Sequence, residues 1–588
     1  MYNKLFTLLL AVILIGSINT SFSSDRNTSY KIVRNGDALR GDNGPFVYNS
    51  TRVNYDMQEY PIVYNQTDAP AVWTITETNV NARTQYDLQS NSVLQYIWQN
   101  PTNALEMHAV FMTSTDPGPS WSDRNGRYFY TSNGGTSWDY IGVVATTRGG
   151  FPCITATNDS RAVILLHSSE NDATTRTYLF ADIAPGAGTW TTLDPGLSNP
   201  ALGNIWPYAY ASKTNNNVLF ASSQNGVDSS KYNVCTNLNS PGTFLGWQTT
   251  PNGETAEQYF VAISDDGQRY GVASLTTSGG AILIESTNGG TTFGAPQTIW
   301  NWNPADSMGT IRSISLVYKG TQPCVALGLA HTDPVAGTFT PGLPSKMVFW
   351  SPSINGGVPV KVDSADGLSG TNSTNDVFLS VTRGVIGTGE FGNAMYIAYN
   401  KARQDTSDIG NNFFDIYVSY SVNDGASWST PIQVTNTSGP LRDFRYVAIA
   451  PRNAGNTVNL ISQRDSIPGS NVNGAPASTA QMVYIKGTDV IGIQTISSEV
   501  PTGFQLMQNY PNPFNPTTKI RFALPVSGFA SLKVYDATGK EVATLVSQNL
   551  TAGTFEYELK GNNLPSGVYF YKLAAGNFVQ TKKMVLVK

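Results

Sequence analysis

A turn motif that recurs along the middle of the chain constrains its fold more than any other feature. The pattern is Ser/Thr-x-Asn-x-Gly-x-Ser/Thr-aromatic, with copies that begin at Thr131, Ser286 and Ser421 and a truncated copy at Ser353. In such a turn the Asn side chain folds back on the backbone, Gly takes a positive φ, and the hydroxyls bind the turn. The aromatic residue can then enter the core between adjacent sheets. We therefore expect repeated β-hairpins that share one core.

The repeat continues between these copies. Weaker turns at Ala187–Trp190 and Leu245–Trp247 fill the gaps, so the closing positions 138, 190, 247, 293, 358 and 428 are 46 to 70 residues apart. Each unit also contains an apolar run, a polar turn and a second apolar run, as in Phe260–Ile263, the turn at 265–267 and Tyr270–Ala273. Four short antiparallel strands in a repeat of this length are typical of a propeller blade.

The two ends of the repeat region suggest how a ring would close. The last unit, from Arg445 to about Lys486, shows three strands, and an early strand at Ala71–Thr76 has no unit of its own. We expect this early strand to be the outer strand of the last unit, where it covers an exposed edge. The predicted fold is all-β, a β-propeller of seven blades, or six if one weak unit is an insertion, followed by a small antiparallel β-sandwich.

These turns resemble the Asp-box (BNR) repeats of sialidase-like β-propellers, with Asn where that family usually has Asp. The resemblance implies structural turns at the blade periphery. For an exo-sialidase it also implies three arginines that clamp a carboxylate, a tyrosine nucleophile with a glutamate, an acidic proton donor, and an early Arg-Ile-Pro strand. The Arg-Ile-Pro strand is absent from this sequence.

The last 85 or so residues follow a different pattern. A proline-rich arm cannot form a helix or a central strand, because each proline lacks an N–H donor and forces its predecessor into an extended conformation. Its residues are Asn509, Tyr510, Pro511, Asn512, Pro513, Phe514, Asn515 and Pro516. Alternating apolar runs separated by glycines follow, which predicts about seven short strands in a small antiparallel sandwich.

This segment, roughly 504–588, resembles the type A C-terminal sorting domain of the type IX secretion system of Bacteroidetes-like bacteria. The matching blocks are the arm, Tyr535-Asp536 with Gly539-Lys540, Leu564 through Gly567 to Tyr569, and Lys583-Met584. The resemblance implies recognition by the type IX secretion machinery, transport across the outer membrane, and usually removal of the domain with surface attachment or release.

The N-terminus agrees with export. Lys4 precedes an apolar run from Leu5 to Ile15, and small residues follow, which is the pattern of a secretory signal peptide. No other run approaches the ~20 apolar residues of a membrane helix, so we expect no transmembrane anchor. The expected division is a signal peptide (1–23), an N-terminal segment with the closing strand (24–92), the propeller (93–493), a linker (494–503) and the sorting domain (504–588).

Composition narrows the possible partners. Charged residues make up 13% of the chain and the net charge is −5, which indicates no nucleic-acid partner. Three cysteines cannot form a complete disulfide framework, and we expect Cys153 and Cys324 to be buried as small apolar residues. The three histidines each follow or end an apolar run, which favours hydrogen-bonded strand ends over a metal site. The sequence indicates no cofactor and no metal.

Candidate functional residues are few. Arginines recur just before predicted first strands, at Arg148, Arg312, Arg383 and Arg445, where they could converge on one end of the ring and bind an anion. Glu390 is the most isolated acid in an uncharged insertion, but glycoside hydrolysis needs two carboxylates and the sequence assigns it no partner. Trp300 and Trp302 are candidate stacking residues for a sugar or a protein.

Two hypotheses therefore stand at this point. The first is a secreted or cell-surface protein, without catalytic activity, whose propeller binds a glycan or a protein. The alternative is an extracellular glycoside hydrolase with a sialidase-like propeller. Whether the protein is an enzyme is not decided by the sequence, which favours binding.

Overall fold

The computed structural model describes residues 30–31, 64–65, 72–85 and 93–588. Gaps fall at 119, 171–173, 226–228, 252–257, 369–378, 391–393, 409, 437–439, 471–474, 489, 491–492, 498–499, 551 and 562–563. The predicted signal peptide lies outside the described residues. Within them the secondary structure consists of strands and two short 3-10 turns, Val80–Ala82 and Asn355–Gly357, so the all-β prediction is confirmed. No helix in this part of the chain is long and apolar enough to cross a membrane.

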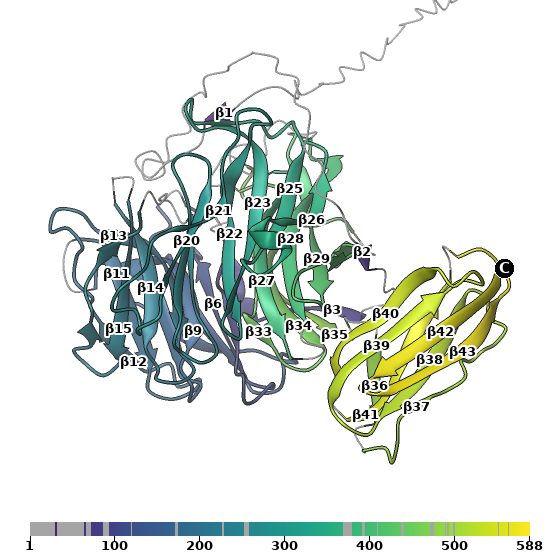
Figure 1. Ribbon diagram of the computed structural model, residues 1–588. Helices are drawn as coiled ribbons and strands as arrows, with labels where there is room; N and C mark the ends of the chain where they lie inside the picture. Colours follow the sequence, from purple (N-terminus) through teal and green to yellow (C-terminus); the bar gives the residue numbers. More distant parts are fainter. Residues whose placement is uncertain are drawn as a thin grey trace, which may run out of the picture.

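The propeller consists of consecutive antiparallel sheets (Figure 1). The strands of the first four sheets are β5 (Ile97–Gln99), β6 (Met107–Thr113), β7 (Asn125–Thr131) and β8 (Asp139–Val143); β9 (Gly150–Ala156), β10 (Ala162–Ser168), β11 (Arg176–Asp182) and β12 (Trp190–Leu193); β13 (Asn204–Ala211), β14 (Val218–Gln224), β15 (Ser230–Asn237), β16 (Thr243–Phe244) and β17 (Gln248–Thr249); and β18 (Tyr259–Ile263), β19 (Tyr270–Leu275), β20 (Ala281–Ser286) and β21 (Gln297–Trp300). Each strand pairs with the next along the chain, except that both β16 and β17 pair with β15.

Three further sheets follow the same plan. Their main strands are β22 (Met308–Lys319), β23 (Gln322–Asp333), β25 (Ser345–Trp350) and β26 (Val360–Ala365); β27 (Val381–Gly389), β28 (Met395–Thr406), β29 (Asn412–Ser421) and β31 (Ile432–Gln433); and β32 (Asp443–Ile449), β34 (Thr457–Asp465), β35 (Ala480–Thr488) and β3 (Val72–Glu77). Short strands add to these sheets at their ends: β1 (Tyr30–Lys31) on β24 (Thr338–Phe339), β2 (Tyr64–Asn65) on β30 (Trp428–Ser429), β4 (Arg83–Thr84) on β35, and β33 (Arg452–Asn453) on β27.

The first strands of these sheets form a closed cycle. The strands β5, β9, β13, β18, β22, β27 and β32 contact one another in this order, and β32 contacts β5. The early strand β3 pairs antiparallel with β35 at the outer edge of the last sheet, from Val72 opposite Thr488 to Glu77 opposite Val483. The ring therefore closes with a strand from the N-terminal side of the chain. This arrangement is a β-propeller, as the repeat predicts.

The recurring turns have the geometry that their residues predict. In the copy between β7 and β8, the Asn133 Oδ1 atom accepts hydrogen bonds from the Ser137 N–H (3.1 Å) and the Thr131 hydroxyl (2.8 Å), and Gly135 has φ 80°. The copies at Asn288 and Asn423 repeat these contacts. Trp138 then packs edge-on against a tyrosine of the last sheet, with ring centroids 5.4 Å apart.

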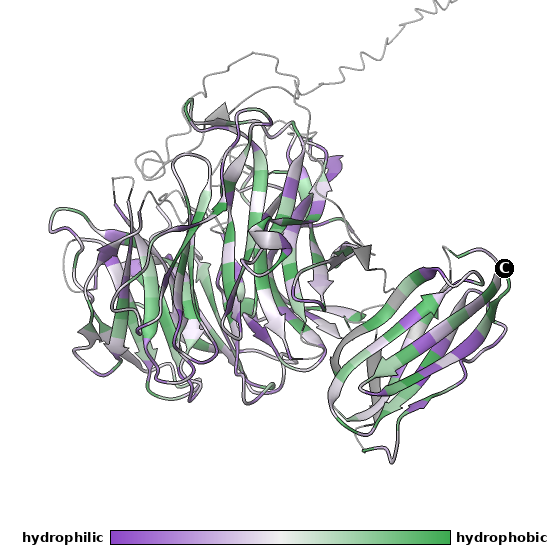
Figure 2. Cartoon of the chain, viewed as in Figure 1, coloured by the Kyte–Doolittle hydropathy of each residue, from purple (hydrophilic) through white to green (hydrophobic). Residues whose placement is uncertain are grey.

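The C-terminal sandwich contains two four-stranded antiparallel sheets. Their strands are β36 (Ile493–Ser497), β41 (Gly553–Lys560), β38 (Thr517–Leu524) and β37 (Gln505–Leu506) in one sheet, and β40 (Glu541–Leu550), β39 (Gly528–Tyr535), β42 (Gly567–Ala575) and β43 (Phe578–Leu586) in the other. Strand β36 corrects the predicted linker at 494–503, because Ile493 pairs with Tyr557 inside the sandwich. Hydropathy alternates along many of these strands, which places one face of each sheet in the core (Figure 2).

The proline-rich arm is fixed against this sandwich. The Asn509 N–H donates to the Tyr571 hydroxyl (2.7 Å), and the Asn509 side chain donates to the Thr518 hydroxyl (2.9 Å). Phe514 is buried, and its N–H donates to the Val585 carbonyl (2.9 Å). In contrast, Tyr510 is 81% exposed. The arm therefore contacts both sheets of the sandwich, with Asn509 and Phe514 as its buried anchors.

Candidate functional site

Five first strands carry a bulge at the end where they begin. In each bulge a residue other than glycine has a positive φ, which costs roughly 1–3 kcal/mol and persists only where the surrounding structure imposes it. The residues are Phe151 (51°), Trp206 (58°), Arg312 (53°), Arg383 (56°) and Tyr446 (57°). The pairing register shifts in the same places, on β9, β13, β22, β27 and β32. Backbone strain of this kind gathers at functional sites more often than elsewhere, so this end of the ring is the candidate site.

Two of the predicted arginines lie in neighbouring bulges. Arg312 and Arg383 are buried within β22 and β27, so they do not precede the strands as expected from the sequence. A hydrogen bond from the Gly384 N–H to the Ser313 hydroxyl (3.0 Å) joins the two bulges. The Arg383 guanidinium carbon lies 5.2 Å from the ring centroid of Tyr446, the bulge residue of the next sheet. Two neighbouring bulges therefore hold a guanidinium group, and the next one holds an aromatic ring.

Arg445 has a different role from the one expected. It lies in β32 and is buried, and its Nε atom donates to Oδ2 of Asp443 (2.5 Å). Asp443 also accepts from the Phe414 N–H (2.8 Å) and the Gly469 N–H (3.2 Å). Burial raises the pKa of Asp443 to about 6, and the neighbouring Arg445 guanidinium acts in the opposite direction. The pair is a buried ion pair that fixes the start of the last sheet.

The opposite side of the same end is aromatic and basic. The Phe151 ring lies 5.3 Å from the His167 ring and 5.9 Å from the Trp206 ring. The Arg124 guanidinium carbon lies 5.7 Å from the Phe151 centroid. Arg148 is exposed, and its Nε donates to the Trp121 carbonyl (3.0 Å). Arg148 therefore lies beside the aromatic bulges, whereas the other predicted arginines lie in or next to bulges of the last three sheets.

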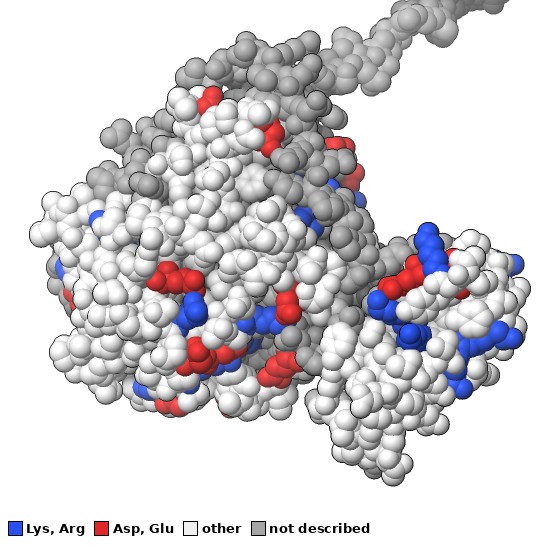
Figure 3. Space-filling model, viewed as in Figure 1, with Lys and Arg blue, Asp and Glu red and all other residues white. Residues whose placement is uncertain are grey.

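The other end of the ring has a charge cluster that sequence reasoning missed. Arg452, in the short strand β33 that pairs with β27, forms an ion pair with Asp265 in the turn between β18 and β19. Lys213, in the turn between β13 and β14, lies 3.4 Å from the same carboxylate. Burial and Arg452 lower the pKa of Lys213 to about 8. On the face in Figure 3, charged side chains gather over the lower part of the propeller. These contacts join sheets on different sides of the ring, which no local pattern could indicate.

Glu390 belongs to this second end. It is exposed, follows the last residue of β27, and its Oε2 atom accepts from the Gly455 N–H (3.3 Å). Arg383 lies near the beginning of the same strand. The structure therefore places Glu390 and the bulge arginines at opposite ends of the ring.

His108, His331 and the three cysteines are buried structural residues. His108 contacts the Tyr128 hydroxyl (2.7 Å) and the Ser160 hydroxyl (3.1 Å), and burial lowers its pKa to about 4. His331 contacts the Ser307 hydroxyl (2.8 Å). The three cysteines are free and buried. Among the described residues, no group of His, Cys, Asp or Glu could hold a metal ion.

The two tryptophan candidates both form hydrogen bonds with the backbone of the propeller. Trp300 is 8% exposed, and its indole N–H donates to the Met308 carbonyl (3.1 Å). Trp302 is half-buried and donates to the Thr332 carbonyl (2.9 Å). Trp302 therefore keeps more accessible ring surface than Trp300.

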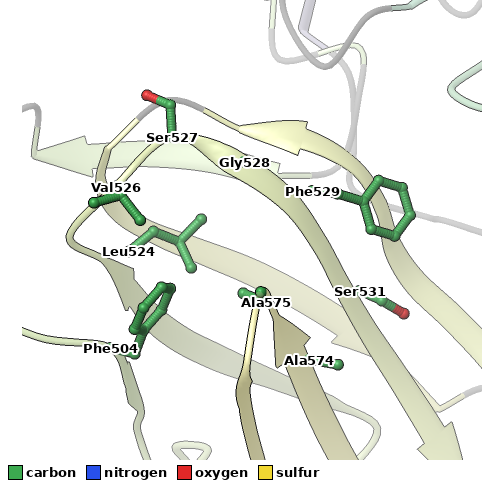
Figure 4. A pocket seen from close by; sticks show the side chains of 10 residues that line it. Phe504, Leu524, Val526, Ser527, Gly528, Phe529, Ser531, Ala574 and Ala575 are labelled. Carbon is green, nitrogen blue, oxygen red and sulfur yellow. The ribbon is translucent and has the colours of Figure 1, made fainter.

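The sandwich has a cavity of about 390 Å³ at one end (Figure 4). Phe504, Leu524, Val526 and Ala575 lie around it, and Ser527 and Ser531 are its polar side chains. It contains no titratable side chain. The cavity is therefore an apolar recess without acid–base chemistry.

Comparison with known proteins identifies the tail. The profile of the secretion system C-terminal sorting domain matches residues 508–588. This domain marks proteins that the type IX system exports to the cell surface or the extracellular space, and it implies contact with that machinery. No curated protein sequence matches the chain.

Similarity to solved structures is distant. The PL25 ulvan lyase has a TM-score of 0.39 and 11% identity, over 68% of this chain and 95% of that chain. The NanB sialidase of Streptococcus pneumoniae has a TM-score of 0.35 and 8% identity, over 55% and 68%. PorZ of Porphyromonas gingivalis, a surface component of the type IX secretion system, has a TM-score of 0.21 and 11% identity, over 84% and 81%.

Proposed function

We propose that this protein is a cell-surface or secreted binding protein with a seven-bladed propeller. In this proposal residues 1–23 are a signal peptide, the segment 24–92 supplies the closing strand, and the sorting domain delivers the propeller outside the cell. The propeller then binds an extracellular glycan or protein at the end where its first strands begin. We favour binding over catalysis as the role of this end of the ring.

The bulges are the observation that supports this proposal. A ring needs no bulge to close, since the first strand β18 pairs regularly with β19 along its whole length. Five other first strands nevertheless hold an aromatic residue or an arginine in a strained conformation near the start of the strand. Aromatic and arginine side chains dominate binding energy at interfaces and stack well on sugars. Selection for ligand binding explains why this strain is retained.

One observation favours the hydrolase alternative. A general acid needs a carboxyl group with a raised pKa, and Asp443 has a pKa of about 6 at the same end of the ring as the arginines. Its complete burial and its ion pair with Arg445 give it a structural task, however. A second carboxylate at hydrolase distance is also required. A binding role therefore explains the geometry without requiring a second carboxylate.

The test screens the purified full chain on glycan and protein arrays together with chromogenic glycosides. We expect retention on at least one ligand, without turnover, and loss of retention in Phe151→Gly. Glu390→Gln is the matched variant at the other end and should bind as the wild type does. Turnover that disappears in Asp443→Asn or Glu390→Gln would establish the hydrolase instead.

The sorting role has its own test. Deletion of 504–588 should leave the protein inside the cell, because the outer-membrane machinery then lacks its recognition domain. Immunoblots of medium, surface and periplasmic fractions measure this. Unchanged delivery of the shortened chain would contradict the role of the tail.

A further inference from the structure

Two arginines are held in place beside His167, at the end of the ring with the bulges. The Arg124 Nε atom donates to the Gly149 carbonyl (3.2 Å). Arg148 donates from Nε to the Trp121 carbonyl (3.0 Å) and from Nη2 to the Ser120 carbonyl (3.3 Å). Backbone carbonyls therefore orient both guanidinium groups before any ligand binds. We call Arg124, Arg148, Phe151 and His167 the His167 cluster.

A glycine makes room for this arrangement. Gly150 lies opposite His167 in the sheet. A Cβ atom at Gly150 would lie 2.8 Å from Nη2 of Arg124, which is too close. Glycine thus allows the Arg124 guanidinium to lie directly against the strand that pairs with His167.

His167 supplies a neutral donor. Its Nδ1 atom accepts the Trp206 N–H (3.3 Å), so the proton of the neutral imidazole is on Nε2. Burial, Arg124 and Arg148 hold the pKa of His167 well below its usual value, which keeps the ring neutral. Its 8% exposed side chain stacks on Phe151, with an interplanar angle of 27°.

The cluster is accessible, and the neighbouring carboxylates of Glu170 and Asp123 accept hydrogen bonds from the surrounding loops. Arg148 is exposed, and Arg124 and Phe151 are half-buried. The Glu170 carboxylate accepts from the Thr147 N–H (3.0 Å). The Asp123 carboxylate accepts from the Thr115 N–H (2.9 Å). The accessible part of the cluster therefore comprises the guanidinium groups of Arg124 and Arg148 and the ring of Phe151.

We propose that the His167 cluster binds an oxyanion substituent, a carboxylate or a sulfate, on an extracellular polysaccharide. This inference rests on the proposed binding role of the same end of the propeller. Guanidinium groups bind oxyanions through paired charge-assisted hydrogen bonds, and the His167 Nε2–H adds a neutral donor. The Phe151 ring offers an apolar face for the sugar. The His167 donor is buried, with 8% of the residue exposed. A small oxyanion substituent fits such a position better than the broad surface of an acidic protein does.

The experiment measures retention of the full chain on four polysaccharides at one ionic strength. Dextran sulfate and dextran share a backbone and differ in sulfate, and polygalacturonate and its methyl ester differ in carboxylate charge. We expect retention on one charged polymer and at least tenfold weaker retention on its neutral counterpart. The charged polymer that binds tells which oxyanion is recognised.

Variants locate the binding. Arg148→Gln should weaken retention on the charged polymer about tenfold, and Arg148→Lys should weaken it less because the charge remains. Gly150→Ala should act like Arg148→Gln, since the new methyl group displaces Arg124. Arg161→Gln is the matched control, because Arg161 pairs with Asp159 in the turn between β9 and β10, at the other end of the same sheet. Thermal unfolding curves show that each variant is folded.

Separate outcomes would overturn the inference and the proposed function. Equal retention on charged and neutral polymers, or wild-type retention by Arg148→Gln, would overturn the oxyanion subsite and leave the binding role intact. If the protein were retained on polyglutamate but on none of the polysaccharides, the assignment of the ligand as a polysaccharide would be wrong. A wild-type protein that binds nothing on these polymers or on the arrays would overturn both.

Discussion

The two ends of the propeller are built from the same sheets but follow opposite rules. Where the first strands end, Asn and Asp side chains complete regular turns, and Arg452, Asp265 and Lys213 join sheets across the ring. Where the first strands begin, five residues with strained backbones carry aromatic or guanidinium groups, and four of these residues are buried. One end pairs its polar groups within turns and between sheets, and the other keeps strained backbones. In the proposed function, this difference separates stability from binding within one fold.

The largest expected effect tests the buried ion pair at the strained end. Asp443→Ala removes the carboxylate that accepts from Arg445, and the guanidinium then stays buried without this counter-charge. Loss of one partner of a buried pair costs about 3–5 kcal/mol of unfolding free energy. Denaturant unfolding of the full chain measures it.

The control for this prediction is Asp405→Asn, because Asp405 pairs with Arg403 on the surface, where its side chain is 57% exposed. An exposed pair contributes at most about 1 kcal/mol. Equal losses in the two variants would show that the Asp443 pair does not hold the start of the last sheet.

The next effect tests the charge cluster at the regular end. Asp265→Asn keeps an oxygen that can accept the Gly320 N–H but removes the charge between Arg452 and Lys213. We expect a loss of about 1–2 kcal/mol, less than for a fully buried pair because the Asp265 side chain is 37% exposed. Ligand retention should be unchanged.

Asp266 offers a neighbouring control in the same turn. Its carboxylate accepts from the Gln268 N–H (3.0 Å) and takes no part in the ion pairs with Arg452 and Lys213. Asp266→Asn should leave the unfolding midpoint close to that of the wild type. If Asp265→Asn reduced ligand retention, the separation of the two ends would be wrong.

A smaller change in stability is expected at a bulge. Phe151→Gly relieves a positive φ, which contributes roughly 1 kcal/mol, and removes a half-buried ring of similar value. The unfolding free energy should therefore change by less than about 1 kcal/mol, while retention on the ligand falls at least tenfold. A large loss of stability with intact binding would make Phe151 a packing residue.

The sequence predicted the features that depend on nearby residues or on an exposed edge. The turn at Asn133 follows from side-chain chemistry over a few positions, and the sorting domain follows from a recognisable motif. The outer-edge strand was expected from edge protection, and β3 lies at that edge. Each of these features has few alternative structures, so the sequence alone is enough to predict it.

The rest depends on pairing between distant residues. The bulges could not be predicted because an extra residue is visible only once Thr382 and Val385 are aligned with Asn400 and Ala398. The recurrence of arginines before apolar runs is the available signal, and it predicts an anion site at one end of the ring but not the bulges themselves. The sequence predicts a linker from Gln494 because the partner of this strand, Gly553–Lys560, lies far along the chain. The contact between Arg452 and Asp265 likewise has no local sequence pattern.

The smallest expected effect concerns the Asn in the turns at the regular end. In Asn133→Asp the carboxylate still accepts from the Ser137 N–H and the Thr131 hydroxyl. The amide donor to the Ser137 hydroxyl (2.8 Å) is lost, but that hydroxyl can turn and donate to the carboxylate instead. We expect the unfolding free energy to change by less than about 0.5 kcal/mol, whereas Asn133→Ala should cost about 1 kcal/mol because the turn N–H loses its acceptor. If Asn133→Asp were as destabilising as Asn133→Ala, the amide donor rather than the oxygen acceptor would hold the turn, and the regular end would depend on Asn specifically.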